Sequence, residues 1–480
     1  MIDKKSSKPL YHQVADNLEG LIDGGTFRPG EKIPSVRQLS QDHRISISTV
    51  MEAYSLLEDR GRVQGRRRSG YFVLPQMPGN RRDRMPTAAR HRNRPVELSC
   101  SAIQEAVMAA IEQPEIIPFG AATPGDDACP HHRLASISHA MARKHGPAAF
   151  RYTMVPGRKD LRTQIAKRNL IAGVEMKPSD IITTTGAIEA VGLALRAVAE
   201  PGDLIVVETP TYFGLLDLVQ KLGLRTIETP LNPETGIDLD ALAETLKSHR
   251  VAACLIQPDF QNPMGSLMPD DHKQKLVSMC AEAGVAIVAD EIYSELHFGD
   301  KRSPSLKAFD EDGIVLQCSS FTKCLSPGLR VGWIAPGRYY DAVKKLKTSL
   351  STASCTLSEM TAAEFLNSGG FDRQLRRVRA LFFSQVQQIR QAIFDAFPEG
   401  TRVSAPQGGF ILWSELPAGV DAEKLAVDAL SENISVVPGS LCSATCQFRN
   451  AIRINCGHAW TSRMEQALGV LGHLASRQLR

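Results

Sequence analysis

The 480-residue chain is too long for one ordinary domain, and its 43% hydrophobic and 22% charged residues are typical of a folded, soluble protein. The first residues lack the apolar stretch of a secretory signal, and no run is long enough to span a membrane, so neither class is expected. The ten cysteines are scattered without a CxxC pair, which favours the reducing cytoplasm over a disulfide framework.

The net charge of +4 is unevenly distributed along the chain. Residues 1–95 hold 18 Lys and Arg against 10 Asp and Glu, a balance of +8, so the remaining 385 residues carry −4. A basic N-terminal part on a mildly acidic body is typical of a nucleic-acid-binding module joined to a unit of another kind.

Residues 8–74 have the pattern of three short helices followed by two strands. The expected helices run from Pro9 to about Gly24, from Pro34 with Ser35 as its cap, and from about Ser48 to Asp59. The third helix directs its apolar side chains into a core, namely Val50, Ala53, Tyr54 and Leu57. The expected strands are at Val63 and at 71–73, with residues 65–70 at the tip between them. This arrangement predicts a winged helix-turn-helix unit with double-stranded DNA as its partner.

In such a unit the third helix enters the major groove with its N-terminal residues. The hydroxyl side chains expected to contact phosphates or bases there are Ser46, Ser48 and Thr49. The cations expected to neutralise phosphates are Arg37, Arg44 and the tip residues Arg66, Arg67 and Arg68. Because the third helix is poor in Arg, Asn and Gln, we expect little direct base readout and salt-sensitive affinity. The alternative is a unit that contacts protein, which the basic tip disfavours.

Residues 75–95 interrupt the pattern of helices and strands. They hold four prolines and six arginines without apolar periodicity, which predicts an extended, mobile linker. Two hypotheses for its charge stay open: a tract that is merely solvated, and a linker that also touches DNA phosphates.

Residues 97–480 alternate short apolar runs with helical segments such as 187–199 and 270–283. The expected strands lie at 181–184, 204–207, 224–227, 252–256, 285–288 and 314–316. This alternation predicts an α/β fold with a largely parallel sheet covered on both faces. A long Arg-rich helix at 372–397 and strands at 409–413, 434–437 and 451–455 predict a smaller α+β lobe at the C-terminal end.

Lys323 lies in a sequence context that favours a chemical role over a solvated surface charge. Ser and Thr residues precede it, and Arg330 follows seven residues later. A pyridoxal-phosphate site needs a lysine amine for the Schiff base and an anion to hold a proton on the pyridine nitrogen. Asp290 follows the strand 285–288, at the edge where an open α/β sheet presents ligands. Asn262 and Tyr293 have the right chemistry to donate to the phenolate oxygen of the ring.

The same site needs groups that bind a phosphate and a carboxylate. Thr185, Gly186 and Ala187 follow a strand and open a helix, which offers backbone N–H groups to an anion. The side chains expected to complete the site are Ser320 and Arg330 for the phosphate, Tyr212 to stack on the ring, and Arg453 as a fork for a substrate carboxylate.

Each of these elements alone is weak evidence for a pyridoxal-phosphate site, but their joint order along the chain is specific.

Cys129-Pro130-His131-His132 is the one segment that suggests a metal, and no second ligand pair follows at zinc-site spacing. We therefore expect a surface turn there and no metal.

These motifs carry a resemblance to known families. Residues 97–480 resemble a fold-type-I, class I aminotransferase domain. Pro34-Ser35-Val36-Arg37-Gln38-Leu39 and Gly70-Tyr71-Phe72-Val73 resemble phrases of the winged helix-turn-helix of GntR-type regulators. Together the two parts resemble the MocR branch of that family, including its YdcR-like members.

The resemblance implies a homodimer, with pyridoxal 5'-phosphate at the subunit and domain interface. It also implies that Tyr152 reaches the cofactor phosphate of the partner subunit. Ala187 departs from the family pattern, because many relatives carry Ser or another polar residue there, so one phosphate hydroxyl is expected to be missing.

Three functions are consistent with these observations. The first is a regulator that binds DNA and pyridoxal phosphate and senses the cofactor, an amino compound or both. The second is a working aminotransferase with DNA binding secondary. The third is a DNA-binding dimer whose body serves only for assembly, which Lys323 and Asp290 disfavour because packing needs neither. The winged helix favours the first.

Overall fold

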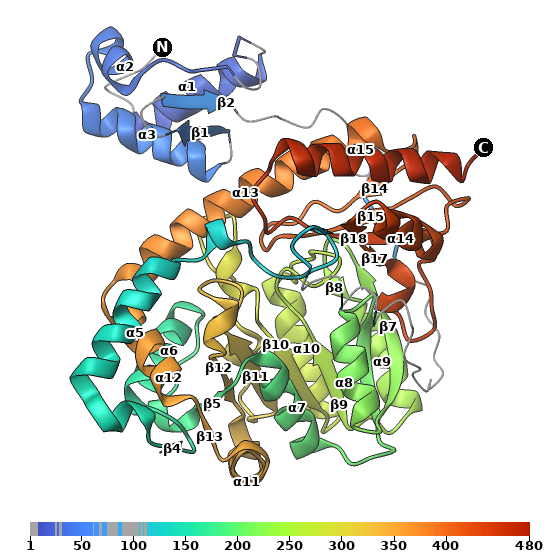
Figure 1. Cartoon of the computed structure of the whole chain (residues 1–480). Coiled ribbons are helices and arrows are strands. Elements are labelled where there is room, and N and C mark those ends of the chain that lie inside the picture. The colour runs from blue at the N-terminus through green and yellow to red at the C-terminus, as the bar shows by residue number, and fades with distance from the viewer. Residues whose placement is uncertain are drawn as a thin grey trace.

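The computed structural model describes residues 8–24, 26–27, 31–60, 62–66, 70–73, 85–88, 105, 109 and 113–480. Figure 1 shows two units, which we call the head (residues 8–73) and the body (residues 113–480). The expected linker lies outside the described residues except for 85–88.

The head has the predicted order of helices and strands. It consists of α1 (Leu10–Asp23), α2 (Val36–His43), α3 (Ile47–Asp59) and the antiparallel pair β1 (Val63–Arg66) and β2 (Gly70–Val73). The four core residues expected from α3 are fully buried. Ser35 caps α2, as predicted, by accepting the backbone N–H of Gln38 at 3.2 Å. Leu21 departs from the expected apolar face of α1, since it is 38% exposed.

The body contains a large sheet in the order β5-β12-β11-β10-β9-β6-β7-β8. Its strands are β5 (Ile182–Thr184), β6 (Leu204–Thr209), β7 (Arg225–Asn232), β8 (Gly236–Ile237), β9 (Ala253–Ile256), β10 (Ala286–Asp290), β11 (Val315–Ser320) and β12 (Gly332–Ala335). The six predicted strands are parallel to one another. The two that the sequence did not predict, β12 and β8, are antiparallel to their neighbours.

Helices cover both faces of this sheet, as expected from its apolar strands. Ile205 and Val207 pack on one face against α7 (Ala187–Val198), α8 (Phe213–Lys221) and α11 (Tyr340–Ser351). Leu204 and Val206 pack on the other face against α9 (Leu239–Ser248) and α10 (Asp270–Glu282). Alternate residues of one strand therefore belong to two separate cores.

The C-terminal lobe (residues 370–480) has a second sheet, in the order β14-β15-β18-β17. Its elements are α13 (Gly370–Ala396), β14 (Arg402–Val403), β15 (Ile411–Glu415), α14 (Ala422–Ser431), β17 (Val437–Pro438), β18 (Ala451–Asn455) and α15 (Ser462–Arg477). Figure 1 shows α13 running from beside α12, next to the large sheet, to α15 in the C-terminal lobe. Among the described residues, no helix combines the length and the apolar character needed to cross a membrane.

A short strand pair joins the two parts of the body, namely β3 (Ile117–Pro118) and β16 (Ile434–Ser435). The remaining elements before the C-terminal lobe are β4 (Thr153–Met154) paired with β13 (Ala353–Ser354), and the helices α5 (His131–His145), α6 (Lys159–Ile171) and α12 (Thr356–Asn367). The surface turn expected at 129–132 was wrong, because Cys129 is buried and His131 begins α5.

Candidate functional site

The carboxyl ends of the parallel strands meet at a cavity of about 120 Å³. The residues that line it are Ala122, Ala187, Ile188, Tyr212, Gln257, Asn262, Asp290, Ile292, Tyr293, Thr322, Lys323 and Arg330. Seven of these were predicted as site residues, although they lie up to 143 positions apart in the sequence. The sheet brings them together because β5, β6, β9, β10 and β11 all end at this edge.

Lys323 lies in the turn after β11 with its amine inside the cavity. Its Nζ donates a hydrogen bond to the carbonyl oxygen of Ala122. Burial lowers the pKa of Lys323 to about 8, and the positive charges of Arg453 and Arg330 act in the same direction. A substantial fraction of the amine is therefore neutral near pH 8, which is the form that attacks a carbonyl group.

Asp290, the last residue of β10, is buried with one oxygen bound and one oxygen free. Gln257 Nε2 donates to its Oδ2 at 2.7 Å, while Oδ1 has no hydrogen-bond partner among the described residues. Burial raises the pKa of Asp290 to about 6, against the opposing effects of Gln257, the backbone N–H of Ile292 and Lys323. A buried acceptor without a donor is costly, so Oδ1 fits a ligand N–H such as that of a protonated pyridine ring.

Asn262 and Tyr293 line the cavity beside Asp290. Tyr293 is 2% exposed and packs edge-on against Phe410, with ring centroids 5.6 Å apart. Burial raises the pKa of Tyr293 well above its usual value, so the phenol stays a neutral donor. Tyr212 precedes α8 and presents its ring to the same cavity.

The start of α7 forms an anion cradle with Arg330. Gly186 has a φ of +111°, and a Cβ built on it would lie 2.7 Å from Nη2 of Arg330, so only glycine fits. Nη2 of Arg330 donates to the carbonyl oxygen of Thr185 at 2.7 Å. No side chain in the described part of the chain caps α7, which leaves its first backbone N–H groups for an anion. The cradle suits a phosphate.

Two residues predicted at this cradle have other contacts. The backbone N–H and the hydroxyl of Thr185 both donate to Glu189, at 2.6 and 2.8 Å. Ser320 lines a small separate cavity, and its Oγ accepts the N–H of Thr322 at 3.3 Å. Thr322, which the sequence did not single out, lines the main cavity instead.

Arg453 on β18 is 1% exposed and incompletely paired. Its Nη2 donates to the carbonyl oxygen of Gly120, whereas Nε and Nη1 have no partner among the described residues. The guanidinium lies over Phe213 and Tyr212, 5.5 and 6.0 Å from the ring centroids. Two unpaired N–H donors on one planar group match the geometry of a carboxylate.

Tyr152 does not line the cavity of its own chain and is 79% exposed. The exposed position leaves the side chain accessible to a second molecule.

Gln257 and Ala122 are contact residues that sequence reasoning missed. Gln257 follows β9 directly, so a polar residue after an apolar run was a usable signal. Ala122 had none, because it is a small apolar residue in the irregular segment that follows β3.

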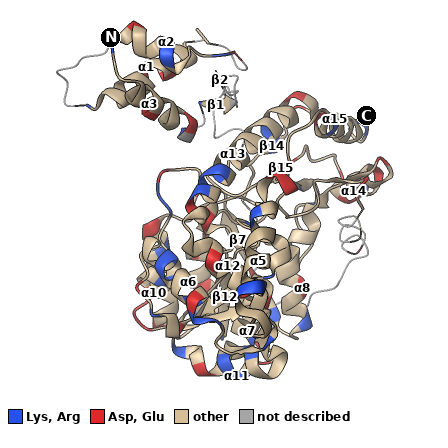
Figure 2. Ribbon diagram, turned by 60° about the vertical axis from the view of Figure 1, so that its left-hand side comes forward, with Lys and Arg blue, Asp and Glu red and all other residues tan. Residues whose placement is uncertain are grey.

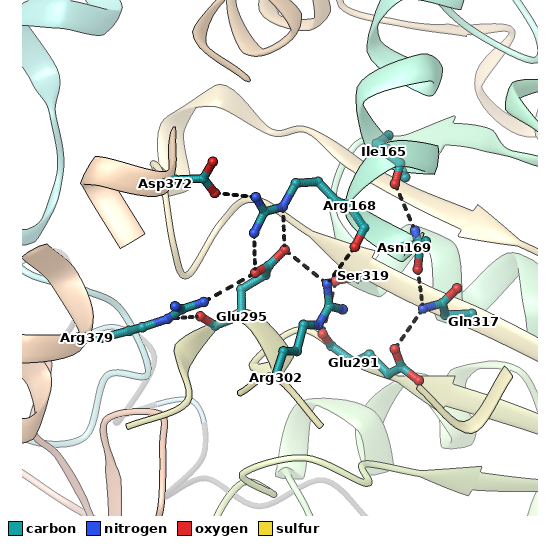
Figure 3. Close-up of polar contacts among 10 residues, drawn as sticks. All are labelled: Ile165, Arg168, Asn169, Glu291, Glu295, Arg302, Gln317, Ser319, Asp372 and Arg379. Carbon is teal, nitrogen blue, oxygen red and sulfur yellow. Dashed lines mark hydrogen bonds and ion pairs between the residues drawn. The ribbon is translucent and has the colours of Figure 1, made fainter. Parts of the chain in front are cut away.

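A charged cluster fixes the segment that follows Asp290 and Tyr293. Figure 3 shows three arginines turned toward Glu295 from different elements, namely Arg168, Arg302 and Arg379. Arg168 binds Glu295 through two hydrogen bonds of 3.0 and 2.9 Å. Although burial opposes it, the surrounding arginines hold the pKa of Glu295 at about 2. The cluster connects the segment that follows Tyr293 to α6 and α13.

In the head, Ser46 caps α3, which is why this helix begins one residue before the predicted start. Ser48 and Thr49 hydroxyls lie 2.8 and 2.7 Å from Ser46 Oγ. Arg37 and Arg44 are exposed on and just after α2. Figure 2 shows one basic residue on α2, while α3, which contains no Lys or Arg, is tan and red. The side chains of Arg66, Arg67 and Arg68 lie outside the described residues.

Both units match known families. Residues 10–73 match the bacterial regulatory proteins of the gntR family, and residues 114–471 match aminotransferase class I and II. The HTH-type transcriptional regulator YjiR of Escherichia coli is 35% identical over 98% of this chain and 99% of its own length. YdcR of the same organism is 32% identical over 98% and 99%. The chain belongs to the MocR-type transcriptional regulators.

The body of this MocR-type regulator also matches solved aminotransferases. LysN of Thermus thermophilus, an alpha-aminoadipate aminotransferase solved with N-(5'-phosphopyridoxyl)-L-leucine, is 29% identical with a TM-score of 0.73, over 79% of this chain and 95% of LysN. Kynurenine aminotransferase of Pyrococcus horikoshii is 26% identical with a TM-score of 0.74, over 80% and 96%. The regulator is thus a GntR-type DNA-binding unit fused to a fold-type-I aminotransferase-like domain that binds pyridoxal phosphate.

Proposed function

We propose that this regulator holds pyridoxal phosphate on Lys323 and controls DNA binding in response to an amino compound that enters the same cavity. The observation that carries the proposal is a set of unmet polar atoms around Lys323. Asp290 offers an acceptor and Arg453 offers two donors, and the charges of both groups act on Lys323. A cavity that served only packing would need neither.

Each residue has a distinct part in holding the cofactor. Asp290 keeps a proton on the ring nitrogen, while Asn262 and Tyr293 donate to the ring oxygen. Arg330 and the backbone at Gly186 and Ala187 bind the phosphate, and Tyr212 covers the ring face. Thr185 and Ser320 stay in this set as weaker members, because Glu189 and Thr322 already bind their polar atoms. Bound there, pyridoxal phosphate supplies an aldehyde that captures amines and a ring that accepts electrons.

The amino compound is proposed to be an amino acid, because Arg453 presents a fork for a carboxylate. The guanidinium would orient the acid group while the amine lies toward Lys323. Arg453 belongs to the C-terminal lobe and lies against Tyr212, which lines the cavity, so a ligand held by both Arg453 and Lys323 would contact both parts of the body. Such a ligand shifts the regulator between postures only by its different affinity for each.

A contact between the linker and the C-terminal lobe offers a route to the head. The backbone N–H and hydroxyl of Thr87 donate to the Glu415 carboxylate at 2.8 Å. Glu415 ends β15, which pairs with β18, the strand of Arg453. We propose the division 8–74, 75–95 and 97–480 for head, linker and body, with the DNA contacts at Arg37, Arg44, Ser46, Ser48, Thr49 and Arg66–Arg68.

The regulator is further proposed to be a cytoplasmic homodimer. Phe150, Tyr152 and Met154 are 73%, 79% and 54% exposed, within five residues of one another. Such an apolar run is typical of a surface that another molecule covers. A second copy seated there would receive Tyr152 at its cofactor phosphate.

The test is binding to the intergenic DNA upstream of the regulator's own gene, with and without pyridoxal phosphate and a panel of amino acids. We expect at least one amino acid to change the affinity in the presence of the cofactor, and Arg453→Met to abolish that response. An affinity that no amino acid alters at saturating cofactor would contradict the sensing role.

A second candidate function is amino-group transfer. The 2-aminoadipate transaminase of Thermus thermophilus is 32% identical over 75% of this chain and 89% of its own length. The complete set of Lys323, Asp290 and Arg453 favours this candidate. Incubation with single amino acids, followed by detection of the matching keto acid, tests it. Binding without keto acid supports the sensor alone.

A further inference from the structure

The outward face of α3 carries two large apolar side chains that the fold does not bury. Ile47 is 51% exposed and Met51 is 55% exposed. Because they are four residues apart, they lie on the same face of the helix, about 6 Å apart along its axis. Apolar surface at such positions is unfavourable in water unless a partner covers it.

The polar side chains at the start of α3 are already engaged with one another. Ser46 Oγ accepts the backbone N–H of Thr49 at 3.1 Å and is also close to the hydroxyls of Ser48 and Thr49. Their first role is to cap the helix. From Ile47 to Asp59 the helix contains no Lys, Arg, Asn or Gln, the side chains that hydrogen-bond to guanine and adenine. Sequence recognition by this helix therefore depends on something other than the usual donors.

The major groove offers one apolar group to a protein, the C5 methyl of thymine. We propose that Ile47 and Met51 contact thymine methyl groups and so select T·A pairs at two positions of the operator. Since base steps are about 3.4 Å apart, the spacing of about 6 Å places both thymines within two base steps. Glu52 is exposed beside Met51. Because its negative charge is repelled by phosphates, we expect this face of α3 to meet base edges and not the phosphate backbone.

This inference rests on the DNA-binding function of the head and adds its sequence preference. The probe is a pool of random-sequence duplexes, from which the full-length protein selects the tightest binder. That duplex is resynthesised with deoxyuridine in place of thymine, one position at a time, which preserves the base pair and removes only the methyl. We expect binding about fourfold weaker at each of two positions within two base steps, from the loss of one buried methyl.

Variants of the pair assign each methyl to a side chain. Ile47→Ala and Met51→Ala should each weaken binding to the thymine duplex about fourfold and abolish the deoxyuridine effect at one position. Met51→Gln should change the selected base at its position to adenine, which glutamine binds through two hydrogen bonds. Val427→Ala on α14, at a residue 59% exposed, is the matched control and should change neither measurement. All three α3 variants should keep the melting temperature, since the side chains are not in the core.

Equal affinity for the thymine and deoxyuridine duplexes overturns the inference. It is also overturned if Ile47→Ala and Met51→Ala weaken both duplexes alike, because the pair would then cover a protein surface such as a second copy. If the wild-type protein enriches no duplex, the DNA-binding function itself fails, and this inference fails with it.

Discussion

Gln257 Nε2 donates a 2.7 Å hydrogen bond to Asp290 Oδ2, whereas Asp290 Oδ1 has no hydrogen-bond partner among the described residues. Gln257 is itself fixed, because its backbone N–H donates to Glu208 and its Oε1 accepts the backbone N–H of Asn262. Burial raises the pKa of Glu208 to about 8, so this second carboxyl is mostly neutral at pH 7. Asp290 is therefore the carboxylate that bears charge beside the cavity.

Gln257→Met should weaken cofactor binding most at low pH. Loss of the donor removes an interaction that lowers the pKa of Asp290, so this pKa rises above about 6 and the charged form is lost as pH falls toward it. Titration of pyridoxal phosphate by absorbance should show a several-fold loss of affinity at pH 6.5 and a smaller loss at pH 8.5. Gln261→Met is the control, because Gln261 donates to Glu208 and Pro210 rather than to Asp290. Equal losses at both pH values would contradict the assignment.

Lys323→Ala should remove the absorbance of covalently attached cofactor at every pH. In the wild type, attachment of pyridoxal phosphate to the apo protein should speed up between pH 7 and 9, because the pKa of Lys323 is about 8 and the neutral amine reacts. Stopped-flow absorbance measures both effects. Lys301→Ala, at an exposed residue, should behave as the wild type. A cofactor spectrum that Lys323→Ala leaves unchanged would rule out this lysine.

Glu295→Gln should destabilise the body by roughly 3 kcal/mol at pH 7. The folded-state pKa of Glu295 is about 2, below its ordinary value of 4.5, so the stabilisation is present above pH 4.5 and lost as pH falls toward 2. Denaturant unfolding at pH 7 and pH 3.5 should show the deficit narrowing at the lower pH. Asp372→Asn changes another partner of Arg168, and its side chain is 60% exposed, so we expect less than 1 kcal/mol.

Arg37→Ala combined with Arg66→Ala should weaken binding to DNA of any sequence. Each arginine that neutralises a phosphate contributes about one to the slope of log affinity against log salt, so the double variant should lower that slope by about two. Fluorescence anisotropy across a salt series gives the slope. Undiminished binding at physiological salt would contradict these contacts.

The sequence predicted the parts of the site that follow directly from a strand. Asp290, Tyr212 and Lys323 each lie at a fixed distance after an apolar run, so the parallel sheet alone brings them together. Thr185 and Ser320 satisfied the same criterion, but Glu189 and Thr322 compete for their polar atoms. That competition depends on side-chain geometry within one turn of chain, which residue spacing does not contain.

The antiparallel strand β12 and the contacts of Ala122 had no sequence signal of their own. Gly332–Ala335 begins with a glycine and lacks β-branched residues except Ile334, and it pairs on both sides, with β5 and β11. The head was more predictable, since its helices are marked by caps and its core residues recur at helical spacing. Its exposed pair on α3 was overlooked because periodicity identifies what is buried and says little about what faces a partner.

The contact of Thr87 with Glu415 gives the head a measurable tether. Val73 ends β2, and Thr87 lies fourteen positions further along the chain. A polypeptide of that length spans at most about 50 Å, which is less than two turns of duplex DNA. While the contact holds, the length of this segment limits the separation of the operator half-sites that two heads can occupy together. Lengthening or shortening the segment should therefore change which half-site spacings the protein binds.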